Sequence, residues 1–150
     1  MKGSLRLWVE TDGDGTGELF AQFNVNGFSG IGSAWFDLLT LAEKAEHFAQ
    51  YPLPQKQFVV LEGGYWNSEN PAVLSQEHLH ISAYPVNLRG GLALRIRVAT
   101  PLDRDDRPQS QFAASVEMKI AYEDIARFSK ELVMLARGEI REVTLIENEI

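Results

Sequence analysis

Hydrophobic and polar residues alternate along most of this chain, which is the pattern of a strand that buries one of its two faces. In the first such segment, Leu5, Leu7 and Val9 alternate with more polar neighbours. The same period predicts strands at residues 5–10, 19–25, 28–36, 58–61, 78–84, 92–99, 112–120 and 140–146. Turn residues separate the first strand from the second, and the fifth strand from the sixth. We therefore expect two antiparallel hairpins.

Two segments have helical spacing instead. Thr40 and Glu43 form a capping box that predicts the start of the first helix, and Pro52 marks its end. The second helix is expected over residues 123–137. Its apolar stripe consists of Ile125, Phe128, Leu132 and Leu135.

The order of these elements predicts a single α+β domain over residues 1–150, with a mainly antiparallel β-sheet and both helices on one face. A chain of this length with 45% hydrophobic residues can bury a substantial core. The residues that we expect to be buried are Phe23, Ile81, Ile96, Val116, Phe128 and Leu132.

Glycines interrupt the apolar pattern at two places. In the block 24–37 they lie inside a strand, where glycine usually marks a bulge, a bend or a close approach of another chain segment. In the block 62–67 they are followed by two large aromatic residues, which predicts a loop after a short strand.

The net charge of −7 narrows the possible partners. An acidic protein repels phosphate backbones, so nucleic-acid binding is disfavoured, whereas a basic protein surface would be attracted. No apolar run approaches the roughly 20 residues that a membrane helix needs, so no membrane partner is expected. The N-terminus has no apolar signal core, which favours a cytoplasmic location. The oligomeric state stays open.

Metal binding has two weak candidates. The segment 12–17 imitates the start of a calcium loop, but position twelve of that loop, which must be acidic, is Phe23. His78 and His80 lie two apart on a strand and should share a face, while Glu77 should point away from them. Without a third ligand we expect no metal site, no cofactor, and no tight binding of calcium or zinc.

A polar face offers an alternative role. If the second hairpin turns near residues 87–91, Arg95 and Arg97 come to share a face with Ser82 and Tyr84, close to His78 and His80. Such a face could bind the carboxylate or phosphate of a small ligand, or support a minor enzymatic activity. Glu117 on the next strand could instead neutralise the arginines.

Nucleophilic catalysis has no support, because the chain has no cysteine and no Gly-x-Ser-x-Gly turn. A non-enzymatic protein-binding module is therefore the leading hypothesis. Exposed aromatic side chains are common at binding hot spots, and Trp66 is the one that we expect to contribute most. The candidate partner-binding residues are Trp8, Glu10, Glu62, Tyr65 and Trp66.

The order of several short patterns resembles the WapI-like group of bacterial toxin immunity proteins and related domains of unknown function. The patterns are Asn26-Gly27-Phe28-Ser29-Gly30, Trp35-Phe36-Asp37, a short helix with Phe48, Arg95-Ile96-Arg97 and a closing helix with Phe128. The resemblance implies a cytoplasmic bacterial protein that binds and neutralises a toxin domain. No catalytic motif comes with it.

Overall fold

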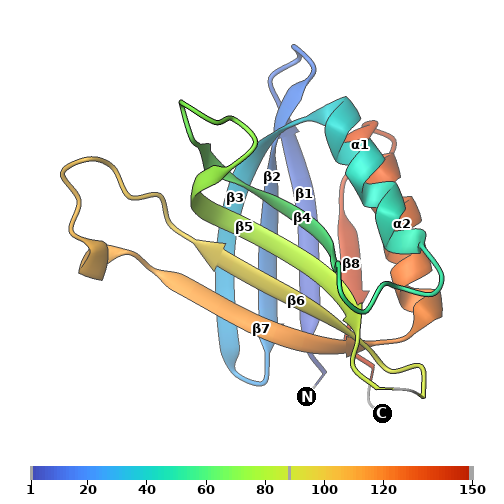
Figure 1. Ribbon diagram of the computed structural model, residues 1–150. Helices are drawn as coiled ribbons and strands as arrows, with labels where there is room; N and C mark the ends of the chain where they lie inside the picture. Colours follow the sequence, from blue (N-terminus) through green and yellow to red (C-terminus); the bar gives the residue numbers. More distant parts are fainter. Residues whose placement is uncertain (1, 88, 149–150) are drawn as a thin grey trace.

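The alternating segments form two antiparallel sheets in the computed structural model, which describes residues 2–87 and 89–148 (Figure 1). Sheet A has the strand order β3-β2-β1-β8, and sheet B has the order β4-β5-β6-β7. Their bounds are β1 Ser4–Thr11, β2 Thr16–Val25, β3 Phe28–Asp37, β4 Val59–Trp66, β5 Leu74–Pro85, β6 Leu92–Ala99, β7 Ala113–Ile120 and β8 Val143–Ile146. The α+β class and the antiparallel pairing predicted from the sequence are confirmed, and the strands are divided between two sheets.

Both predicted hairpins are present. In the first, Leu5 pairs with Phe23 and both side chains are buried. In the second, Ile81 pairs with Ile96, again with both side chains buried. The register therefore sends the apolar positions of adjacent strands to the same side of each sheet, as the alternation requires.

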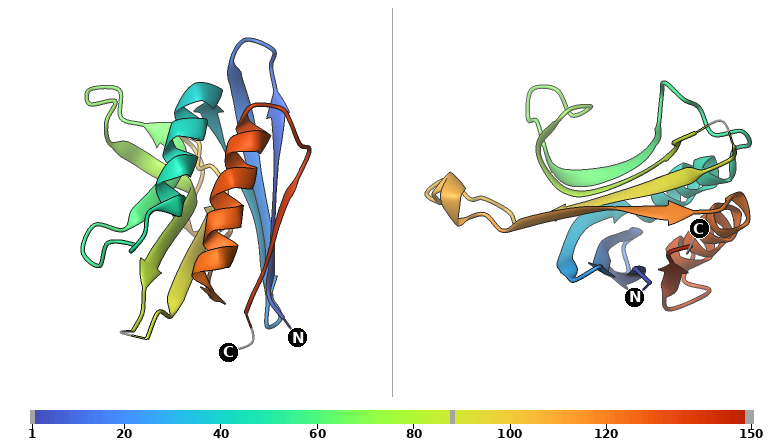
Figure 2. Two further views of the ribbon diagram at one scale, coloured as in Figure 1. Left: turned by 90° about the vertical axis from the view of Figure 1, so that its right-hand side faces the viewer. Right: turned by 90° about the horizontal axis from the view of Figure 1, so that it is seen from below.

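Two helices, α1 (Leu38–Glu46) and α2 (Tyr122–Ala136), lie side by side against both sheets. When they face the viewer, sheet B lies on one side of them and sheet A on the other (Figure 2). The helix α1 begins earlier than the predicted capping box: Asp37 is its N-cap and accepts a hydrogen bond from the backbone N–H of Thr40 at 3.0 Å. Thr40 therefore lies inside the helix, because the carboxylate of Asp37 already accepts the hydrogen bond from its N–H group. Within the described residues, no helix has both the length and the apolar character that a membrane crossing would need.

The strand β3 lies directly against sheet B, which selects the close approach among the three alternatives that the glycines in block 24–37 left open. A Cβ atom at Gly32 would lie 2.7 Å from Cβ of Val98, and one at Gly30 would lie 2.9 Å from a methyl group of the same valine. No side chain fits there. The glycines therefore mark a close approach between the two sheets.

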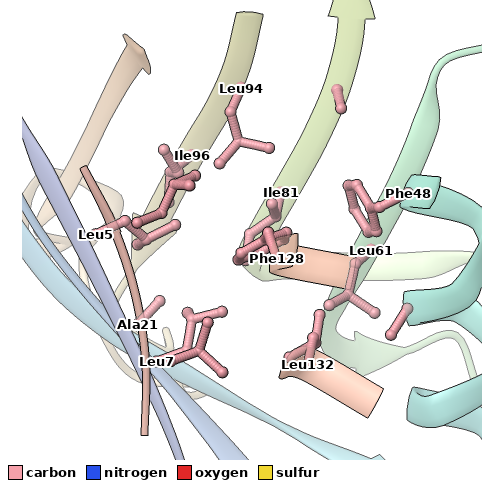
Figure 3. Close-up of a cluster of buried hydrophobic side chains, with 14 of the residues drawn as sticks. Leu5, Leu7, Ala21, Phe48, Leu61, Ile81, Leu94, Ile96, Phe128 and Leu132 are labelled. Atoms are coloured by element: carbon pink, nitrogen blue, oxygen red, sulfur yellow. The ribbon is translucent and has the colours of Figure 1, made fainter. Parts of the chain in front are cut away.

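The hydrophobic core fills the space between the two sheets and the two helices (Figure 3). Five of the six residues predicted to be buried are at most 1% exposed: Phe23, Ile81, Ile96, Phe128 and Leu132. The sixth, Val116, is only half-buried although it packs against the core. It lies on β7, an edge strand of sheet B, two residues before the fully buried Met118.

The segment predicted as a loop at residues 62–67 is instead mostly strand. Strand β4 continues through Gly63 and Gly64 to Trp66, with irregular pairing to β5 after Gly63 and after Tyr65. Glycine weakened the strand signal in the sequence, but here it marks a β-bulge.

Truncating Phe128 tests this core. Its ring is 1% exposed and meets the ring of Phe48 edge-on, with centroids 5.7 Å apart. We expect Phe128→Ala to lower the free energy of unfolding by about 3–5 kcal/mol in urea denaturation, as for other buried aromatic residues. Phe112→Ala is the control, because that side chain is 78% exposed and should cost little. A loss below about 1 kcal/mol for Phe128→Ala would contradict the assigned face of α2.

Candidate functional site

The outward face of sheet B carries the polar residues that the sequence singled out. The register aligns Glu62 of β4, His80 of β5 and Arg97 of β6 in one row across the sheet. The next row contains Ser82 and Arg95, with Glu117 of β7 beside Arg95. The predicted gathering of His80, Ser82, Arg95 and Arg97 on one face of this sheet is therefore present.

A β-bulge changes which side chains meet on this face. Gly63 pairs with Leu79, but the next residue, Gly64, pairs with Glu77, so that His78 is skipped. A Cβ atom at Gly64 would collide with the carbonyl oxygen of Gln76, so glycine permits this close pairing. The bulge places two buried residues, instead of one, between Glu77 and His80.

The prediction that Glu77 points away from His80 is therefore wrong. An oxygen of Glu77 (Oε2) lies 3.1 Å from Nδ1 of His80. His78, which we expected beside His80, is 4% exposed and hydrogen-bonds through Nε2 to the side chain of Gln76 at 2.9 Å. Its ring also packs edge-on against Tyr65, and burial lowers its pKa.

His80 is the centre of a small cluster, which we call the Glu–His cluster and define as Glu62, Glu77 and His80. Oε2 of Glu62 lies 3.9 Å from Nδ1 of His80. The other ring nitrogen, Nε2, lies 2.9 Å from the hydroxyl of Ser82, a residue that is only 2% exposed. The ring is thus held from both sides, with Nδ1 facing the two carboxylates.

The electrostatics of the Glu–His cluster are those of two carboxylates close together. Partial burial raises the pKa of Glu62, and hydrogen bonding and repulsion from Glu77 raise it further, while His80 and Lys44 oppose this effect. Arg97 lies 3.9 Å from the other oxygen of Glu77, Oε1. Arg97 therefore flanks the cluster at Oε1 of Glu77, while Oε2 of the same residue faces His80.

The second row of this face places Tyr84 and Arg95 near the carboxylate of Glu117. The hydroxyl of Tyr84 donates a hydrogen bond to Glu117, and burial together with this carboxylate raises the pKa of Tyr84 to about 12. Arg95 stands directly opposite Glu117 in the register. Arg97 lies close to Glu77 and Arg95 stands opposite Glu117, so a small anion on this face would compete with these carboxylates for the two arginines.

The predicted partner-binding residues are divided between the two sheets. Tyr65 and Trp66 lie at the end of β4 and are 43% and 41% exposed, and the ammonium group of Lys44 lies 6.0 Å from the centre of the Trp66 ring. Trp8 and Glu10 lie on β1 of sheet A. The predicted partner-binding residues are therefore split between two sheets that meet across the shared core, and they do not form one continuous surface.

Trp8 belongs to a larger apolar surface on the outward side of sheet A. Its ring stacks on that of Phe20 with centroids 5.2 Å apart and an angle of 3° between the planes. Two further side chains of β3 point to the same side: Ile31, 56% exposed, and Trp35, 51% exposed. We call Trp8, Phe20, Ile31 and Trp35 the aromatic face.

Sequence reasoning included Trp8 but missed Phe20 and Ile31 as members of the aromatic face. They occupy positions in residues 19–25 and 28–36 where the alternation would place polar residues. The sequence therefore contained a signal that could have identified them. Their grouping depends on the register, which aligns Trp8 with Phe20 and places Trp35 next to the row of Phe20 and Ser33.

A groove of about 440 Å³ adjoins the aromatic face at Trp8. It runs between the end of β1 and the segment that follows α2, and its floor includes Val9 and Leu38. The strand β8 pairs only with Ser4–Leu7, so the remainder of β1 has no neighbouring strand on that side. The aromatic face is thus continuous with an open sheet edge.

Comparisons of this chain with protein-family models, curated proteins and solved structures give no match. The resemblance to WapI-like immunity proteins therefore stays a prediction, and the argument for function depends on the geometry of the two outward faces.

The raised pKa of Glu62 leads to a prediction about stability and pH. The pKa of the Glu62 carboxyl is higher in the folded state than its ordinary value of 4.5. The free energy of unfolding therefore decreases as the pH rises from this ordinary pKa to the pKa of the folded state, and it stays lower above that pH. We expect Glu62→Gln to be more stable than the wild type at pH 7, and this advantage to disappear near pH 4. Urea denaturation in the presence of a chelator measures the difference.

The control is Glu69→Gln, in the exposed turn after β4, which should change stability little at either pH. A Glu62→Gln variant that is less stable than the wild type at pH 7 would show that attraction to His80 and Lys44 outweighs repulsion from Glu77.

Proposed function

We propose that this protein is a non-enzymatic binding module that uses the aromatic face of sheet A to bind a protein partner with a basic surface. The observation that carries the proposal is the stacked pair of Trp8 and Phe20, extended by the half-exposed side chains of Ile31 and Trp35. Tryptophan and other large aromatic residues dominate the binding energy of many protein interfaces.

The aromatic face is rigid as well as apolar. It is built on three adjacent strands, and the guanidinium of Arg6 covers the Trp8 ring at 4.5 Å while it also pairs with Glu142 at 2.8 Å. A surface held in this way loses little conformational entropy when a partner binds. Contiguous exposed apolar surface on a sheet also needs a reason, since it carries a risk of aggregation.

Charge indicates what kind of partner fits. Glu10 and Glu18 lie in the same row as Trp35 at the border of the aromatic face. Among the ion pairs of the described residues, neither of these carboxylates is paired with a basic side chain. Together with the net charge of −7, they favour a partner that brings lysine or arginine to the rim of the interface.

A toxin domain with a basic surface is the partner class that we propose. It agrees with the resemblance to WapI-like immunity proteins, and neutralisation by binding requires no catalytic group. The alternative of a small anionic ligand on sheet B is less well supported, because Arg95 and Arg97 each face a carboxylate there.

The proposal predicts which tryptophan matters. Once the partner has been captured from the source cell by cross-linking and then purified, we expect Trp35→Ala to weaken its binding by about 2 kcal/mol or more in calorimetry. Trp66→Ala, on the other sheet, is the matched control and should bind like the wild type. Association should also slow as salt is added, because charges about 10 Å apart are screened at 0.1 M salt.

Two results would contradict the proposal. If Trp66→Ala abolishes binding and Trp35→Ala does not, the partner binds at the end of β4, as the sequence led us to expect. If the purified partner has an acidic surface, or binds faster at high salt, the argument from charge is wrong.

A further inference from the structure

The Glu–His cluster lies on the sheet opposite the aromatic face, and no part of the proposed function uses it. Its three residues come from two strands: Glu62 from β4, and Glu77 and His80 from β5. One ligand atom from each residue lies within 4.8 Å of the other two. The register and the bulge produce this convergence, which does not depend on a flexible loop.

The distances within the cluster are close to those of a metal site. Zinc bonds of about 2.0–2.2 Å to nitrogen and carboxylate oxygen place neighbouring ligand atoms of a tetrahedron roughly 3.4 Å apart. The distances from Nδ1 of His80 are 3.1 Å to Glu77 and 3.9 Å to Glu62. Small side-chain rotations would suffice to bring the three atoms around one ion.

The surroundings of His80 resemble those of histidine ligands in metalloproteins. Such a histidine uses one ring nitrogen for the metal and donates the N–H of the other to a fixed acceptor. In His80, Nδ1 faces the carboxylates and Nε2 lies 2.9 Å from the buried hydroxyl of Ser82. Arg97 lies near Oε1 of Glu77, while Oε2 accepts a hydrogen bond from Nδ1 of His80. An ion bound at Nδ1 would therefore displace that proton to solvent, and the N–H of the ring would then be the one on Nε2, beside Ser82.

We propose that Glu62, Glu77 and His80 bind a divalent transition-metal ion of the zinc type, with a fourth position open to solvent. One imidazole with two carboxylates suits zinc better than magnesium or calcium, which prefer oxygen ligands alone and more of them. The three side chains are 20–41% exposed, so an ion can enter and can keep a water molecule or accept a ligand from outside.

This proposal replaces the expectation that zinc would find no third ligand. That expectation depended on strict alternation along β5, which would have turned Glu77 to the other face. The expectation for calcium at residues 12–17 is a separate matter and is unchanged: Asp14 there is hydrogen-bonded to Thr16 within the turn.

Calorimetric titration of the metal-free protein with Zn²⁺ tests the site. We expect one ion per chain with a dissociation constant in the micromolar range or below, and no comparable binding of Mg²⁺ or Ca²⁺. His80→Gln and Glu77→Gln should each weaken Zn²⁺ binding by tenfold or more, and Ser82→Ala by about tenfold. His47→Gln, which removes an exposed histidine of the short helical turn after α1, should bind Zn²⁺ like the wild type.

Co²⁺ provides an independent readout, since its visible spectrum reports the coordination of the ion; a four-coordinate signal should be present in the wild type and absent in His80→Gln. Circular dichroism checks that each variant is folded. The proposal is overturned if Zn²⁺ does not bind at millimolar concentration, or if folded His80→Gln and Glu77→Gln bind it as tightly as the wild type. Loss of binding in His47→Gln alone would place the ion elsewhere and would also overturn it.

Discussion

The contact of β3 with sheet B is the constraint on which the rest of the structure depends. At Gly30 and Gly32 the backbone of β3 lies so close to Val98 of β6 that no side chain can be inserted. Here the two sheets share one core, and the helices complete the enclosure of that core. A larger residue at either glycine would force the sheets apart and expose the apolar side of both. Packing therefore limits which side chains the inner faces of the two sheets can carry, whereas the side chains of the outward faces are free of this constraint.

A second backbone feature decides what one of those outward faces can do. The bulge opposite Gly63 and Gly64 inserts a residue into β5 and turns Glu77 to the side of His80. Without it, Glu77 would lie on the opposite face, and His80 would meet Glu62 alone. The one extra residue in β5 thus brings the side chains of Glu62, Glu77 and His80 together on one face of the sheet. Bulges are common next to functional sites for this reason.

The sequence was a good guide to most features that depend on local period. Alternation located the strands, the helical stripe identified Phe128 and Leu132 as core residues, and the element order gave the α+β class. The first helix was placed too late because Thr40 and Glu43 matched a capping box, whereas the N-cap in the structure is Asp37, at the end of β3.

Features that depend on pairing between strands were not accessible in the same way. The division into two sheets, the bulge in β5 and the meeting of Trp8 with Phe20 all follow from which strands are neighbours and in which register. A shift of one residue moves a side chain to the other face, so a small error in pairing changes the site completely while the fold class stays correct. The prediction of Glu77 failed for this reason.

The two outward faces differ in chemistry, and the core keeps them apart. Sheet A presents stacked and half-exposed aromatic side chains bordered by Glu10 and Glu18, whereas sheet B presents carboxylates matched with arginines around His80. An apolar face contributes binding energy through the apolar surface area that a partner removes from water. A cluster of charged side chains contributes it through a few charge-assisted contacts at one position. Because Leu7 and Leu61 lie between these faces, in the buried layer that both sheets share, a surface substitution on one face leaves the packing of the other intact. The proposed binding of a protein partner and the proposed binding of an ion can therefore be tested separately by single substitutions in one folded molecule.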